Sequence, residues 1–162
     1  MVRDNKGDAH IRSGDQKRKL SEEEIRDHFL IHLNGHYEGQ ATGETFNQTG
    51  KTDIIIKDGG RNVFIAECKF WGGGKAFGSI IDQLLGYTSW RDTKTAIFLF
   101  NKNRDTSKVL EQIPGLVESH PNCKRGAPGR LDETRFRYVL HQQGDRNREF
   151  YLTVCLYDIP SP

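Results

Sequence analysis

The sequence predicts an α/β fold in which a mixed central β-sheet is flanked by helices. Residues 95–100 form a continuous apolar run, which is typical of a strand buried on both faces. Residues 77–88 carry apolar side chains at helical spacing, so they predict a helix with one buried stripe. Short β-rich runs and helical segments alternate along the chain, and we therefore expect them to share one core.

The N-terminal third predicts an arm, a helix and a strand. Residues 1–20 are polar and lack periodicity, which predicts a mobile arm or linker, whereas residues 21–162 are long enough for a single domain. Ser21 and Glu24 have capping-box spacing, in which each side chain satisfies a backbone amide of the other. The helix that starts there is expected to end at Asn34-Gly35. A first strand is expected over residues 37–46.

The remaining elements follow from turn residues and apolar runs. A hairpin is expected around Asp58-Gly59-Gly60, and Gly72-Gly73-Gly74 is expected to lead into the helix of residues 77–88. The helix of residues 107–119 contains Pro114, which is expected to bend or split it. Residues 120–133 predict a loop. The last two strands, residues 135–141 and 149–157, are expected to pair across a turn at 144–147.

The hairpin of residues 53–69 carries the residues with the clearest chemistry. Side chains alternate along a strand, so Glu67 and Lys69 emerge on one face and Cys68 on the other. A hairpin of this length can bring Asp53 beside Glu67. Two carboxylates at close range repel each other unless a cation lies between them, and Mg²⁺ favours a few carboxylates together with water and phosphate oxygens. The alternative interpretation is a surface ion pair between Glu67 and Lys69.

These residues resemble the PD-(D/E)xK nuclease superfamily, which has the restriction endonuclease-like fold. Its signature is an Asp at the start of one strand and Glu-x-Lys on the next, here Asp53 and Glu67-Cys68-Lys69. Several branches add Gln-x-x-x-Tyr on the following helix, matched by Gln83 and Tyr87. The resemblance spans residues 21–103, and the element order predicted above, α-β-β-β-α-β-α-β-β, matches the core of the superfamily. The chain departs from the signature because no Pro precedes the Asp.

The resemblance implies a role for each of these residues. Asp53 and Glu67 would bind the metal, with the backbone carbonyl of Cys68 as a third ligand, and Mg²⁺ would be the cofactor with Mn²⁺ able to substitute. Lys69 would orient the attacking water or stabilise the transition state. Gln83 would touch the water, the phosphate or Lys69, although a solvated Gln is the alternative. Tyr87 would support Gln83, contact substrate or anchor the core.

An acidic residue of the first helix is a further ligand in many members of the superfamily. Glu22 lies on the same helix face as Ile25, whereas Glu24 is better explained as the cap. Glu44 on the expected first strand is the rival to Glu22. Cys68 is expected to be a small core residue, because no His–Asp pair accompanies it as a nucleophile would require.

Composition limits the remaining possibilities. The net charge is only +2, from 24 basic and 22 acidic side chains, which argues against a nucleic-acid coat protein. Basic residues nevertheless gather in runs, which serve as solvated faces or as phosphate contacts: Lys17-Arg18-Lys19, Lys124-Arg125, Arg130, Arg135 and Arg137. The three cysteines show no disulfide spacing, so we expect a reduced, cytoplasmic compartment. No apolar run is long enough to cross a membrane.

The sequence therefore predicts a Mg²⁺-dependent nuclease that hydrolyses phosphodiester bonds, with DNA a better candidate than RNA and endonucleolytic cleavage favoured. By resemblance, restriction or defence against foreign DNA is the expected setting. A chain of this size is expected to act as a homodimer or within a larger assembly. The alternatives are a nuclease that cleaves RNA and an inert module of the same fold that binds nucleic acid or protein.

Overall fold

We describe the fold from a computed structural model, which describes residues 21–22, 24–27, 54–58, 61–88, 94–124 and 129–159. The expected arm of residues 1–20, the expected strand of residues 37–46, Glu44 and Asp53 lie outside the described residues. No helix in the described part of the chain is long and apolar enough to cross a bilayer.

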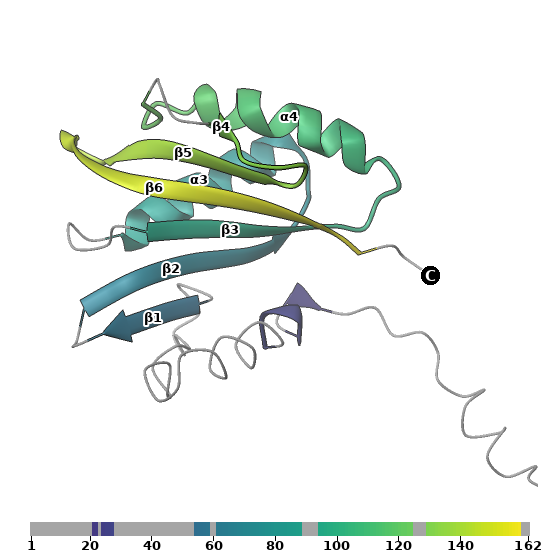
Figure 1. The fold of residues 1–162 in the computed structure, drawn as a ribbon, viewed down its shortest axis with the longest axis horizontal. Helices are drawn as coiled ribbons and strands as arrows, with labels where there is room; N and C mark the ends of the chain where they lie inside the picture. The colour runs from purple at the N-terminus through teal and green to yellow at the C-terminus, as the bar shows by residue number, and fades with distance from the viewer. Residues whose placement is uncertain are drawn as a thin grey trace, which may run out of the picture.

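The centre of the fold is a mixed β-sheet with strand order β1-β2-β3-β6-β5-β4. Parallel pairing joins β2 to β3 and β3 to β6, whereas the outer pairs β1–β2, β6–β5 and β5–β4 are antiparallel. The predicted mixed sheet is therefore confirmed (Figure 1). The strands are β1 Ile54–Asp58, β2 Arg61–Phe70, β3 Lys94–Asn101, β4 Gly129–Arg130, β5 Arg135–Gln142 and β6 Asp145–Asp158.

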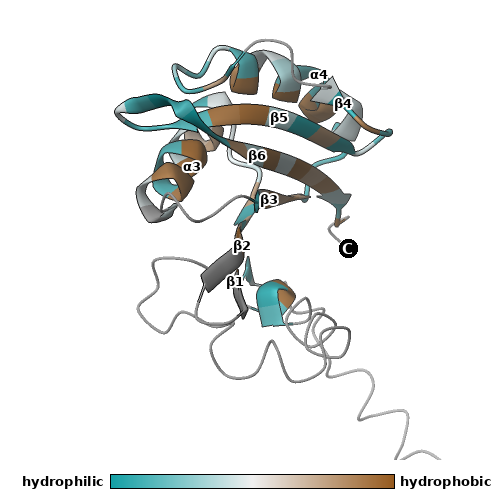
Figure 2. Cartoon of the chain, turned by 60° about the vertical axis from the view of Figure 1, so that its left-hand side comes forward, coloured by the Kyte–Doolittle hydropathy of each residue, from teal (hydrophilic) through white to brown (hydrophobic). Residues whose placement is uncertain are grey.

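Two helices, α3 (Gly74–Tyr87) and α4 (Thr106–Glu118), lie together on one face of the sheet (Figure 1). Their apolar sides face the strands, as the brown surfaces toward the sheet show in Figure 2. The apolar residues predicted for the first of these helices are buried, and Phe77, Ile81 and Leu84 pack in the same cluster as Ile97 of β3 and Leu152 of β6. Burial of these stripes is the main source of stability, since isolated helices of this length are marginal in water.

The opposite face of the sheet carries a smaller cluster near its β1–β2 edge. Ile25, from the helical turn of residues 22–27, packs there with Ile54, Ala66 and Cys68. The predicted capping box starts that turn: Ser21 N donates to Glu24 Oε2 at 2.9 Å, and Glu24 N donates to Ser21 Oγ at 3.2 Å. The helical turn is thus fixed at its first residue and anchored by one buried side chain.

The structure differs from the sequence prediction in three places. Pro114 does not split α4, because the helix loses only one backbone donor there while Ile113 and Val117, both 0% exposed, hold it on the sheet. The last hairpin is tighter than expected: Gln142 pairs with Asp145 across a two-residue turn, and Gly144 adopts φ 79°. The expected loop of residues 120–133 contains β4, which pairs with β5.

Candidate active site

The carboxyl half of β2 presents Glu67 and Lys69 on one face and Cys68 on the other, as alternation requires. Ile65, two residues before Glu67, packs under α3 and α4, whereas Cys68 belongs to the cluster of Ile25 and Ala66. The prediction that Cys68 is a small core residue is confirmed, since it is 1% exposed. Glu67 is also 1% exposed, so a surface ion pair of Glu67 with Lys69 does not describe it.

At its carboxyl end, β2 has different hydrogen-bond partners on its two edges. On one side β3 runs in register as far as the Phe70–Phe100 pair, and Trp71 N then donates to Phe100 O at 2.8 Å. On the other side the described ladder with β1 begins at the Ile54–Ala66 pair. Beyond that pair, Phe70 N donates to Glu22 Oε1 at 2.9 Å. A carboxylate therefore takes the position at which a neighbouring strand would supply a carbonyl.

Glu22 contacts the side chain of Lys69 as well as the Phe70 amide. Its Oε2 lies 3.9 Å from Lys69 Nζ, with side-chain exposures of 32% for Lys69 and 37% for Glu22. An ion pair with this exposure contributes about 1 kcal/mol or less, so its main effect is on position rather than on stability. Of the three acidic residues considered, Glu22 is thus brought to the end of β2, Glu24 caps the helix, and Glu44 lies outside the described residues.

Gln83 and Tyr87 lie on α3, which covers the face of the sheet that Glu67 shares with Ile65. Gln83 is half-buried and makes no hydrogen bond with Glu67 or Lys69 among the described residues. Tyr87 is the last residue of α3, and its side chain lies outside the described part of the chain. The structure therefore places both on the expected helix.

The expected metal ligands are carboxylate and carbonyl oxygens, which suit Mg²⁺ and Mn²⁺. No three His, Cys, Asp or Glu side chains converge within the described ranges, and Asp53 lies outside them. Glu22 and Glu67 are the described carboxylates at the end of β2. Backbone groups two residues apart on a strand face the same edge. The Cys68 carbonyl therefore points to the edge of β2 at which Phe70 N donates to Glu22, as a metal ligand beside Glu22 would have to do.

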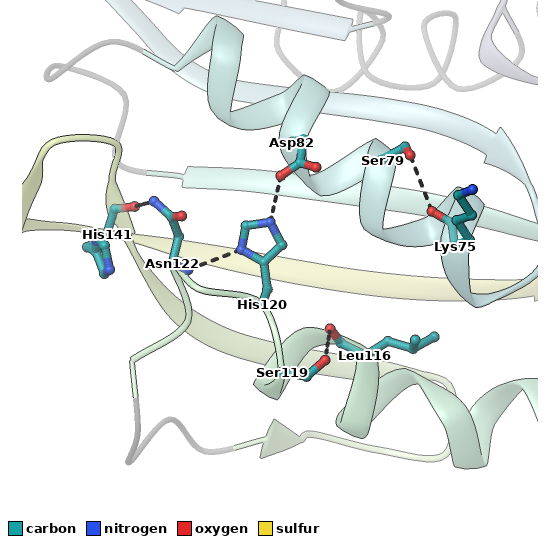
Figure 3. Close-up of polar contacts among 8 residues, drawn as sticks. All are labelled: Lys75, Ser79, Asp82, Leu116, Ser119, His120, Asn122 and His141. Carbon is teal, nitrogen blue, oxygen red and sulfur yellow. Dashed lines mark hydrogen bonds and ion pairs between the residues drawn. The ribbon is translucent and has the colours of Figure 1, made fainter.

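A hydrogen-bonded group that the sequence did not predict joins α3 to the turn after α4 (Figure 3). His120 Nε2 lies 2.7 Å from Asp82 Oδ1, and Asn122 N donates to His120 Nδ1 at 3.1 Å. Asn122 Nδ2 in turn donates to His141 O at 3.0 Å. This arrangement matches a ring protonated on Nε2, and it holds together two helices and β5. His120 is therefore structural, and only its spatial neighbours reveal this.

No family model, no curated protein and no solved structure matches this chain.

Proposed function

We propose that the chain is a Mg²⁺-dependent nuclease with the restriction endonuclease-like core, acting on DNA. The observation that supports this most directly is the register of β1 on β2, in which Ile54 lies opposite Ala66. Asp53 directly precedes Ile54 and Glu67 directly follows Ala66. If the antiparallel register continues by one residue, their side chains share one face with Cβ atoms about 5 Å apart. That spacing suits two carboxylates that bind one cation.

In this proposal Asp53, Glu67 and the Cys68 carbonyl bind the metal. When bound, Mg²⁺ would lower the pKa of a water ligand and offset the charge that grows on the scissile phosphate. A buried carboxylate such as Glu67, 1% exposed, would bind a cation in surroundings of low dielectric constant, where the attraction is stronger than in water.

Lys69 would use its ammonium group to orient the attacking water or to stabilise the non-bridging phosphate oxygens. Glu22 supports this role because its carboxylate lies 3.9 Å from Lys69 Nζ and is itself fixed by the Phe70 amide at 2.9 Å. We therefore assign Glu22 to positioning Lys69, and Gln83 to a contact with substrate made only in the complex. Cleavage of both strands of a duplex would need a second copy of the chain or its repositioning.

The decisive experiment is cleavage of plasmid, linear duplex, single-stranded DNA and RNA with Mg²⁺, with Mn²⁺ or with EDTA. Glu67→Gln and Lys69→Met are expected to lower the cleavage rate by about 100-fold or more, the usual cost of losing one group that stabilises transition-state charge. The matched controls are Glu111→Gln and Lys108→Met on the exposed side of α4, which are expected to cleave like the wild type. Cleavage that survives both EDTA and Glu67→Gln would refute the metal-dependent mechanism.

Metal binding can be measured without cleavage. A ligand present at ten times its dissociation constant stabilises the folded state by RT ln 11, about 1.4 kcal/mol, or roughly 3–6 °C in Tm for a domain of this size. Asp53→Asn and Glu67→Gln are expected to abolish the shift that Mn²⁺ produces, and Glu111→Gln to retain it. Nucleic-acid binding with no metal shift and no cleavage in the wild type would instead favour the inert binding module.

A further inference from the structure

A second candidate site lies on the other face of the sheet from α3 and α4. It is a pocket of about 410 Å³. Its lining combines two cationic side chains, two aromatic rings and two threonines: Phe64, Lys94, Thr95, Arg137, Tyr151 and Thr153. Volumes of about 300–1,000 Å³ are usual for sites that bind small molecules.

The strand register explains why these residues meet. Lys94 on β3 lies opposite Tyr151 on β6, and Thr153 lies opposite Arg137 on β5. Leu152 and Tyr138, which alternate with Tyr151 and Arg137, are buried beneath the helices, so Tyr151, Thr153 and Arg137 project from the opposite face. Lys94 shares that face, because Ile97, three positions along β3, is buried beneath the helices, whereas Thr95 lies on the helix side. Tyr151 is 51% exposed, which leaves its ring open to a ligand.

The two cationic side chains at the pocket differ from nearby ones in their ion pairing. Arg135 pairs with Asp132 and Lys124 pairs with Glu149, whereas neither Lys94 nor Arg137 forms an ion pair within the described ranges. From two strand spacings and a two-residue offset, their Cα atoms are about 12 Å apart, within reach of one ligand for two long side chains. Thr95 Oγ1 donates to Tyr151 O at 2.8 Å, which fixes β3 against β6 at the rim.

We propose that this pocket binds a nucleotide, with its base against the ring of Tyr151 and its phosphate near Lys94 and Arg137. An exposed aromatic ring beside cations is the combination by which proteins bind single-stranded nucleic acid without reading its sequence, and a free mononucleotide offers the same base and phosphate. Charge complementarity favours an anion, because no ion pair neutralises these two cations among the described residues. The site is separate from Glu67 and Lys69, and the proposal does not depend on cleavage.

The test is binding in EDTA, measured by fluorescence anisotropy with labelled oligo(dT) and with a fluorescent ATP analogue. Lys94→Gln and Arg137→Gln are each expected to weaken oligo(dT) binding about tenfold and to reduce the slope of log K against log salt by about 0.7, the value for one phosphate contact on a single strand. Tyr151→Thr is expected to weaken it about tenfold or more through lost stacking. Lys108→Gln on α4, whose side chain is 74% exposed, is the matched control and is expected to bind like the wild type.

Each outcome decides the proposal. Loss of oligo(dT) binding alone supports a nucleotide within a strand, and loss of the ATP analogue alone or of both supports a free nucleotide as a ligand. No binding of either probe by the wild type, or binding that these three variants leave unchanged, overturns it. An effect of the two charge variants without any effect of Tyr151→Thr also overturns it, since a basic face would then suffice. Because EDTA prevents metal-dependent cleavage, failure here is distinguishable from failure of the proposed nuclease activity.

Discussion

Tyr138 offers a sharp test of the packing of the main core. It lies on β5, is 2% exposed, and its hydroxyl finds no hydrogen-bond partner in the described part of the chain. Burial raises the pKa of Tyr138 from its ordinary value of 10.0 to about 12, and negative charge on Glu118 and Cys123 adds to the shift. The phenol is therefore neutral at ordinary pH, and its buried oxygen makes no hydrogen bond within the described residues. Tyr138→Phe removes that oxygen and keeps the ring.

The size and sign of the effect follow from linkage between protonation and folding. Below pH 10 the phenol is protonated in both the folded and unfolded states, so it contributes no pH dependence. Between pH 10 and about 12 the unfolded chain loses the proton first, and the free energy of unfolding falls as pH rises. Over the whole of this range the loss is on the order of 2–3 kcal/mol. At neutral pH the variant is expected to be as stable as the wild type or more so by about 1 kcal/mol, because an unsatisfied buried hydroxyl is lost.

The assay is urea unfolding at pH 8, 9, 10, 10.5 and 11, followed by tryptophan fluorescence. Trp71 packs on this core and against Phe77 and is expected to report its unfolding. The wild type is expected to lose stability relative to Tyr138→Phe as the pH rises through this range. Tyr151→Phe, at a ring 51% exposed, is the matched control and is expected to follow the wild type. A loss of more than about 1 kcal/mol at pH 8 in Tyr138→Phe would show that the hydroxyl makes a bond, and would refute the reasoning.

Three further substitutions probe other parts of the fold. Ile113→Ala on α4, where the side chain is 0% exposed, is expected to cost about 2–5 kcal/mol in urea unfolding, and a cost below 1 kcal/mol would contradict the burial of α4 on the sheet. Gly73→Ala is expected to lower thermal stability by about 1–3 kcal/mol through backbone strain alone, since φ is +98° with ψ 171°, a region that only glycine readily adopts, and no atom lies within 4 Å of an added Cβ. Hydrogen bonds from Arg135 and the Thr134 amide lower the pKa of Asp132, so the stability that Asp132 confers relative to Asp132→Asn should be present above pH 3.8 and vanish as the pH falls below it. Equal acid unfolding profiles for these two proteins would contradict that assignment.

The pattern of apolar residues predicted two kinds of element: a strand buried on both faces and a helix with one buried stripe. The buried side chains of α3 and the apolar run of β3 are recognisable because a single physical requirement, burial, fixes their pattern. The start of β6 was missed because Asp145 to Arg148 belongs to a polar hairpin, in which exposed strand residues resemble a loop. The predicted split at Pro114 was wrong, since tertiary packing offsets one missing backbone donor.

The features of the candidate sites that depend on local geometry were also predicted, and those that depend on tertiary contacts were not. Alternation along a strand predicted that Glu67 and Lys69 share a face, because that depends on the chain's local geometry alone. The contact of Glu22 with Phe70 N joins residues 48 positions apart, and capping and helix-face arguments could only nominate Glu22. The pocket of Lys94, Tyr151 and Arg137 requires the strand order β3-β6-β5, which no local pattern encodes. Which strands lie side by side after a crossover connection is decided by the tertiary structure.

The hydrogen bond from the Phe70 amide to Glu22 also bears on how separate copies of this chain avoid one another. A sheet edge with available backbone amides invites a strand from a neighbouring molecule, and inward charges are one means by which proteins prevent such pairing. A carboxylate at 2.9 Å from Phe70 N occupies that donor and repels an approaching carbonyl. The short helical turn that carries Glu22 thus covers one backbone donor that a strand from another molecule would otherwise use.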